Sequence, residues 1–202
     1  MLLGPKYKIC KRLGASVFEK CQTQKFQLAE ARAPRRTRSK RGGGGDYGAQ
    51  LLEKQKARFT YGLSESQFSR YVHEAMEHHT DRTAGLLSRL EARLDNTVYR
   101  AGFVKTRRAA RQMVSHGHIM LNGRRMNIPS HKVEMGDVIS IRPESRDSAL
   151  FLNRAEAVAE TKTPQWLALE DGGFAAKVAA APGVGETEAG FSAPVIIQFY
   201  SR

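Results

Sequence analysis

Apolar residues recur at helical spacing through the middle of the chain. Phe68, Val72 and Met76 lie four residues apart, and a second stripe keeps the i, i+3, i+4 spacing of one helix face. The second stripe consists of Leu87, Leu90, Leu94, Val98 and Ala101. Residues 46–101 are therefore expected to be mainly helical, and Gly102 suits the residue that ends a helix.

The pattern changes after one further short helix. Thr106 suits the N-cap of a helix over 107–116, whose inward residues would be Ala109, Ala110, Met113 and Val114. Strand-like segments follow at HIML, RRMNI and DVISI, and Asn122-Gly123 between the first two favours a tight hairpin turn. This order predicts an α+β fold in which two helices pack on a small, mostly antiparallel sheet.

The pattern is weaker beyond residue 143. The stretch PQWLALE (164–170) is expected to form a turn and a strand, and residues 175–190 are expected to form a loop. The segment APVIIQFYSR (193–202) is apolar and β-branched, which favours a buried strand or extended segment.

Residues 1–45 are basic and poor in periodic apolar positions. The run APRRTRSKRGGGG (33–45) ends in four glycines, with no Gly-Lys-Ser/Thr after them, so it is not a phosphate-binding loop. We expect a basic, partly extended N-terminal arm, because such a segment buries too little apolar surface to offset its ordering entropy.

The net charge of the chain indicates which kind of partner it binds. The 202 residues include 33 Lys and Arg against 20 Asp and Glu, a net charge of +13. Residues 1–58 carry +11, residues 59–142 carry +5 and residues 143–202 carry −3. Such an excess points to a polyanionic partner.

No apolar run reaches the roughly 18–20 residues of a membrane span, and no secretory signal begins the chain. We therefore expect a soluble protein in a reducing compartment and no membrane partner.

Catalytic and metal chemistry find no support in the motifs. In HEAMEHH, His78 lies five residues after His73, which is off the face that a zinc-protease helix needs. Cys10 and Cys21 supply two thiolates where a structural zinc needs four ligands, so they are expected to be buried or unpaired thiols. Acidic residues such as Glu91 lie near bases at helical spacing, which favours solvated helix faces. We expect no catalytic residue, metal or cofactor.

The basic helix is the exception. Arg107 and Arg111 are i, i+4 neighbours of like charge, which costs a few tenths of a kcal/mol, about 0.2–0.5, in isolation. That cost makes sense if phosphates lie across the face, since guanidinium groups bind them bidentately. The adjoining turn and hairpin add His116, His118, Asn122, Arg124 and Arg125. The prediction is a single cationic surface; the alternative is a merely soluble basic face. Folded RNA fits such a surface better than DNA does, and DNA stays open as an alternative partner.

Residues 93–141 strongly resemble the RNA-binding module named after small-subunit ribosomal protein S-four. The matching positions are Arg93-Leu94-Asp95, Arg100, Gly102-Phe103, Thr106-Arg107, Ala110-Arg111-Gln112, Val114 to Ile119, Asn122-Gly123-Arg124 and Asn127-Ile128. Three flanking stretches, LGPKYKICKRLG, DYGAQLLEKQKARFTYGLSESQF and APVIIQFYSR, resemble the S-four ribosomal protein family itself, in its bacterial or organellar form. The chain departs from many members in lacking a four-cysteine zinc knuckle and in the glycine-rich segment 33–45.

The resemblance implies a structural constituent of the small ribosomal subunit, not an enzyme. It would bind 16S-type ribosomal RNA, nucleate assembly of the subunit body and contribute to translational accuracy. Implied neighbours are ribosomal protein S-five and messenger RNA near the point where it enters; homo-oligomers are not expected. The location would be the cytoplasm, or the matrix of an organelle. The alternatives are a free-standing RNA chaperone or translational repressor, and an RNA-modifying enzyme that uses the same module.

Three parts are predicted: an arm over 1–45, a helical domain over 46–88 completed by 193–202, and the module with a C-terminal extension over 89–192. The predicted RNA-binding residues are basic or polar side chains of all three. They are Lys6, Lys8, Arg12, Lys54, Lys56, Arg58, Arg93, Arg100, Arg107, Arg108, Arg111, Gln112, His116, His118, Asn122, Gly123, Arg124 and Arg125.

Overall fold

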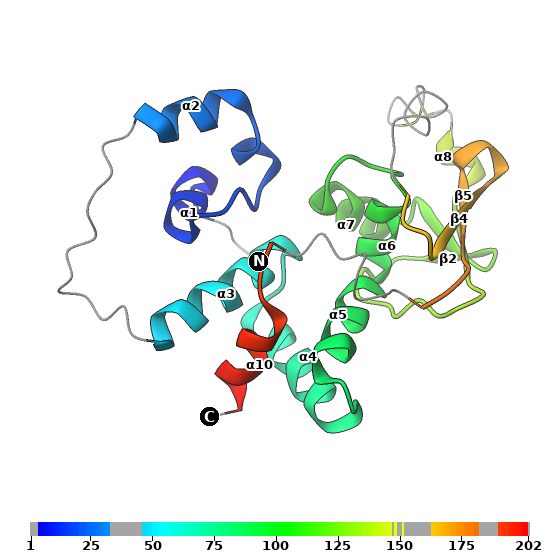
Figure 1. Cartoon of the computed structure of the whole chain (residues 1–202). Helices are drawn as coiled ribbons and strands as arrows, with labels where there is room; N and C mark the ends of the chain where they lie inside the picture. The colour runs from blue at the N-terminus through cyan, green and yellow to red at the C-terminus, as the bar shows by residue number, and fades with distance from the viewer. Residues whose placement is uncertain are drawn as a thin grey trace. The chain divides into compact units, whose positions relative to one another are not determined.

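The computed structural model describes residues 4–32, 46–146, 148, 151, 163–181 and 190–201. The glycine-rich run at 33–45 and residues 182–189 of the expected loop lie outside these. The chain divides into two compact units, Met1–Leu86 with Glu188–Arg202, and Leu87–Thr187 (Figure 1). Each unit is described by itself below.

The first unit begins with helices where an extended arm was expected. These are α1 (Lys6–Leu13), the 3-10 turn η1 (Glu19–Cys21) and α2 (Gln24–Arg32). Their small core contains Cys10, Phe18, Cys21 and Phe26, with Phe59 packed against it. Each of the three elements contributes only one or two buried residues, so no long periodic stripe appears in the sequence. The prediction of an extended conformation is therefore wrong for the described part of this segment.

The rest of the first unit consists of α3 (Asp46–Thr60), α4 (Glu65–His78) and α10 (Ala193–Tyr200). The C-terminal segment is a helix, so the expectation of a strand is wrong. Ala193, Ile196 and Ile197 are buried at i, i+3 and i+4, and this helical spacing outweighs the strand preference of the isoleucines. In Figure 1, α10 lies beside α3.

Three helices follow: α5 (Arg82–Glu91), α6 (Leu94–Arg100) and α7 (Arg107–His116). The apolar stripe from Leu87 to Ala101 is buried as predicted, but the helix breaks at Arg93, which has extended backbone. The predicted start of α7 is confirmed, because the Thr106 hydroxyl accepts a hydrogen bond from the Ala109 N–H at 3.0 Å. Gly117, at φ 75°, ends the helix.

The second unit contains one antiparallel sheet in the order β2-β1-β3-β5-β4. Its strands are β1 (Ile119–Leu121), β2 (Arg124–Met126), β3 (Val138–Ile141), β4 (Leu167–Glu170) and β5 (Ala175–Val178). Two short helical turns, α8 (Pro143–Arg146) and η2 (Asp171–Gly173), lie between strands. The hairpin and the strands near 137–141 and 164–170 are confirmed, whereas residues 175–178 form a strand and not a loop.

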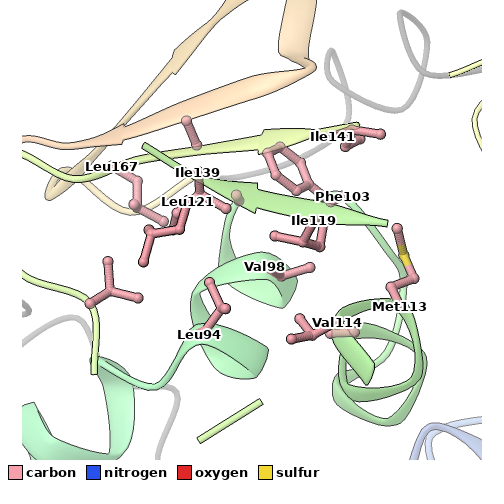
Figure 2. Close-up of a cluster of buried hydrophobic side chains, with 14 of the residues drawn as sticks. Leu94, Val98, Phe103, Met113, Val114, Ile119, Leu121, Ile139, Ile141 and Leu167 are labelled. Carbon is pink, nitrogen blue, oxygen red and sulfur yellow. The ribbon is translucent and has the colours of Figure 1, made fainter. Parts of the chain in front are cut away.

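The α+β class is confirmed by the core that joins these elements. Figure 2 shows Val98 of α6 and Val114 of α7 pointing toward Ile119 of β1. Ile139 and Ile141 of β3 belong to the same buried cluster. Because α6 and α7 are packed on the same sheet, the polar sides of the two helices are held in a fixed relation to each other and to the hairpin.

Candidate RNA-binding surface

A buried carboxylate at the start of α6 holds two arginines. The Asp95 Oδ1 and Oδ2 accept hydrogen bonds from Nε and Nη2 of Arg93 at 3.0 and 2.8 Å. The same Oδ2 accepts from Nε and Nη2 of Arg111 at 2.8 and 2.6 Å. Asp95 is 3% exposed. It therefore fixes the plane of the Arg111 guanidinium on α7, whose side chain remains 34% exposed.

A second buried acid organises the neighbouring side chains. Glu91 Oε2 accepts hydrogen bonds from Asn96 Nδ2 at 3.0 Å and from Arg100 Nε at 2.9 Å. The Asn96 Oδ1 in turn accepts from Arg107 Nε at 2.8 Å. The Arg107 guanidinium also lies 4.3 Å from the centroid of the Tyr99 ring. Arg107 is thus oriented from α6 as Arg111 is.

These contacts revise two expectations. Glu91 and Asp95 are buried and not solvated, and Arg93 and Arg100 are buried with them, so these two arginines support the surface from below. Within the protein, Arg111 forms an ion pair with Asp95, whereas Arg107 donates a hydrogen bond to the neutral amide of Asn96. The missed signal is Asp95-Asn96, an acid and an amide in the first turn of α6 that bond to arginines of the next helix.

The outer face of α7 carries the remaining predicted side chains. Arg108, Gln112 and His116 lie four residues apart, and all three are exposed. Residues at this spacing occupy one side of a helix. Beside them, on the flank toward α6, lies Arg111. The helix therefore presents a polar and cationic ridge.

Asn122 and Gly123 form the predicted turn, at φ 50° and 76°. The Asn122 side chain is used within the protein: its Nδ2 donates to Asp137 Oδ1 at 2.8 Å, and its Oδ1 accepts from the Val138 N–H at 2.9 Å. Asn122 thus ties the hairpin tip to the start of β3. Arg124 and Arg125 follow the turn and are exposed.

Arg125 connects the hairpin to the end of α7. Its Nη2 donates to the His116 carbonyl oxygen at 3.2 Å. Its guanidinium lies directly over Gly117, where a Cβ would collide with it. On the adjoining residue, His118 Nδ1 lies 3.0 Å from the Ser145 hydroxyl. The predicted meeting of the basic helix and the hairpin in one surface is present in the second unit.

In the first unit, three predicted cations of α3 are paired with acids. Lys54 Nζ and Arg58 Nη1 lie 2.7 and 3.0 Å from the two carboxylate oxygens of Glu65. Lys56 Nζ lies 2.6 Å from Glu53 Oε1. Lys54 is buried and its neighbours are partly buried. Lys54 and Arg58 therefore join α3 to α4, whereas Lys56 is paired within α3.

Glu65 is the centre of that group. Burial raises the pKa of its carboxyl, but hydrogen bonds from Lys54, Tyr200 and Arg58 outweigh burial and lower the pKa overall. Tyr200 of α10 donates its hydroxyl to Glu65 at 2.9 Å. Burial and this carboxylate raise the pKa of Tyr200. The charged carboxylate thus holds α10 against α3 and α4.

The predicted cations of α1 are differently placed. Lys8 and Arg12 are exposed, as is Lys11, which the sequence prediction omitted. Lys6 is partly buried, with Nζ 5.5 Å from the centroid of the Phe18 ring. Beneath them, Cys10 and Cys21 form a disulfide. The expectation of buried thiols is right about burial and wrong about the free thiol state.

The sequence of this chain matches known proteins along most of its length. Residues 92–139 match the S4 domain, and residues 1–91 match the ribosomal protein S4/S9 N-terminal domain. The chain is 44% identical over 202 residues to small ribosomal subunit protein uS4 of Roseiflexus castenholzii, covering 99% of this chain and 98% of that protein. The chain belongs to the uS4 family. It is also 41% identical to the uS4 protein of Chloroflexus aurantiacus, over 99% of this chain and 98% of that one, and 41% identical to that of Persephonella marina, over 98% of each.

Membership of the uS4 family confirms the resemblance found in the sequence. The S4 domain contains the Asp95 network, the exposed side of α7 and the hairpin. Among the described residues, no three His, Cys, Asp or Glu side chains are grouped to hold a metal ion. No helix in the described ranges has the length and apolar character needed to cross a membrane.

Proposed function

We propose that this chain is a structural constituent of the small ribosomal subunit that binds 16S-type ribosomal RNA and is not an enzyme. The observation that carries the proposal is the surface formed by α7 and the β1–β2 hairpin, where Asp95 fixes Arg111 and where Arg125 bonds to His116. Near-full-length similarity to uS4 proteins supports the same conclusion.

The mechanism is charge neutralisation by pre-positioned groups. Cations that displace condensed counterions from phosphates gain affinity that falls steeply with salt. A guanidinium already fixed by a carboxylate loses less side-chain freedom on meeting a phosphate. Arg107 and Arg111 would contact phosphates directly, whereas Arg93 and Arg100 would act through the network beneath them. Rigid presentation of this kind selects RNA shape more than base sequence.

Wider roles are part of the proposal. A protein that fixes a junction of RNA helices would nucleate assembly of the subunit body, and its position would influence translational accuracy. The neighbours we infer are ribosomal protein S-five and messenger RNA near its entry channel. The proposed location is the cytoplasm, or the matrix of an organelle if the source is one.

The test is reconstitution with deproteinised bacterial small-subunit RNA and the other subunit proteins. We expect one copy per particle to remain after a high-salt wash. Release of the chain by that wash would favour a free-standing RNA chaperone or translational repressor instead. Chemical change in the RNA on incubation with the pure chain would favour an RNA-modifying enzyme.

A further inference from the structure

Tyr7 on α1 has an aromatic ring with one covered and one open side. The ring stacks on Phe26 of α2, with centroids 5.2 Å apart and planes inclined by 13°. Phe26 is 5% exposed, whereas Tyr7 is 46% exposed. The buried ring therefore supports the tyrosine from beneath, and the solvent-exposed part of Tyr7 is its other side and edge.

The helix that carries the ring is cationic. Helix α1 has the sequence KYKICKRL, which contains no acidic residue. Lys8 and Lys11 are exposed, and Lys11 lies one turn after Tyr7 on the same side of the helix. An open aromatic face beside exposed cations is the arrangement by which proteins hold single-stranded nucleic acid, with the base on the ring and the backbone along the cations.

A second exposed tyrosine shows what is particular to this one. Tyr47 on α3 is 57% exposed, but its ring is tilted by 35° against Phe199. It directly follows Asp46 in the first turn of its helix, so its neighbour in the chain is an acid and not a lysine. Exposure alone therefore does not distinguish Tyr7; the parallel support and the neighbouring lysines do.

We propose that Tyr7 is a stacking platform for an unpaired base of small-subunit ribosomal RNA, with Lys8 and Lys11 on the phosphates beside that base. The inference rests on the proposed function and extends it to a named contact in the first unit. It assigns to α1 a selective role, the recognition of an unstacked nucleotide, in addition to its positive charge.

The experiment compares full-length variants in binding to deproteinised bacterial small-subunit RNA across a series of salt concentrations. Tyr7→Leu should weaken binding by about tenfold without changing the dependence of affinity on salt, because a base and not a phosphate contact is lost. Tyr7→Phe should bind as the wild type does, because the ring is kept. Lys8→Gln with Lys11→Gln should weaken binding and also flatten the salt dependence. Tyr47→Leu is the matched control and should bind within about twofold of the wild type, since most surface changes are nearly neutral.

Tyr7→Trp gives a second, independent readout. The introduced indole should keep the affinity, and its fluorescence should be quenched by the RNA beyond any change seen in the wild type, whose tryptophan, Trp166, is buried. Unchanged affinity of Tyr7→Leu, equal losses in Tyr7→Leu and Tyr7→Phe, or an unquenched indole would each overturn the inference. Failure of the wild type itself to bind the RNA would contradict the proposed function instead.

Discussion

The S4 domain and helix α1 both present cations, but they hold them in different ways. In the S4 domain, Arg93 and Arg111 share the carboxylate of the buried Asp95. In α1, Lys8 and Lys11 are exposed on a helix without acids. The difference teaches that net charge and charge placement are separate properties. Exposed lysines attract RNA over a distance, whereas fixed guanidiniums set the geometry of the contact.

The strongest test of this contrast is Asp95→Asn. The substitution keeps the shape of the side chain but leaves the buried Arg93 without its counter-charge. Loss of one partner from a buried ion pair costs about 3–5 kcal/mol. We expect the free energy of unfolding, measured by urea denaturation, to fall by that amount, with the loss confined to the S4 domain.

Glu134→Gln is the matched control for that variant. Glu134 lies 3.5 Å from Lys132 in the same domain, but its carboxylate is exposed. Exposed pairs contribute about 0–1 kcal/mol. A change in Asp95→Asn no larger than in Glu134→Gln would mean that the network does not stabilise the S4 domain.

The next test concerns the disulfide beneath α1. Cys10 and Cys21 are 11 residues apart, and closing a loop of that length is worth about 3 kcal/mol in the chain-entropy treatment. Reduction should increase the rate at which protease cleaves residues 4–32 and leave cleavage within the S4 domain unchanged. The double variant Cys10→Ala with Cys21→Ala should be cleaved, with or without reductant, as fast as the wild-type protein is cleaved after reduction. Equal protection before and after reduction would show that packing around Phe18 suffices.

The third test compares the two kinds of cation directly. Arg107→Ala with Arg111→Ala should weaken binding to small-subunit RNA by about 100-fold at moderate salt, since each hydrogen bond to a charged group contributes about 1.5–3 kcal/mol. Lys8→Gln with Lys11→Gln should cost less at moderate salt, about tenfold, because these side chains must be ordered on binding. Filter binding over a salt series gives both numbers. Equal losses for the two pairs would remove the distinction between fixed and free cations.

The smallest expected effect comes from Glu65, which is less buried than Asp95 and less exposed than Lys8 and Lys11 of α1. Because its pKa is lowered in the folded protein, the carboxylate stabilises the fold above the unfolded value of 4.5, and this contribution disappears as the pH falls through the lowered folded pKa. Glu65→Gln should therefore be less stable than the wild type at pH 7, and the two urea midpoints should converge in acid. Parallel midpoints down to pH 3 would contradict the ionic role of Glu65.

The sequence predicted best those features that depend on neighbours along the chain. The cap at Thr106, the turn at Asn122-Gly123 and the stripe from Leu87 to Ala101 need only local rules, and each is present. The two-residue turn fixes the pairing of β1 with β2 and so sets Arg125 opposite Met120.

The errors share a different cause, which is dependence on contacts between distant segments. The burial of Glu91 and Asp95 follows from the packing of α6 against α7, and the pairing of Cys10 with Cys21 follows from the fold of three short elements. The helix α10 forms where its isoleucines meet the first unit. Single-sequence patterns contain no direct record of such contacts, so solvated acids, free thiols and a strand were the natural expectations.

The packing of α10 on α3 and α4 has a consequence for the order in which the protein matures during its own synthesis. The first unit takes helices from both sides of the second in the chain, so α3 and α4 leave the ribosome well before the helix that covers them. The whole S4 domain is translated in that interval and is able to fold first, since domains fold as units as they emerge. At that stage the nascent chain would contain a folded S4 domain, while the first unit would still lack α10.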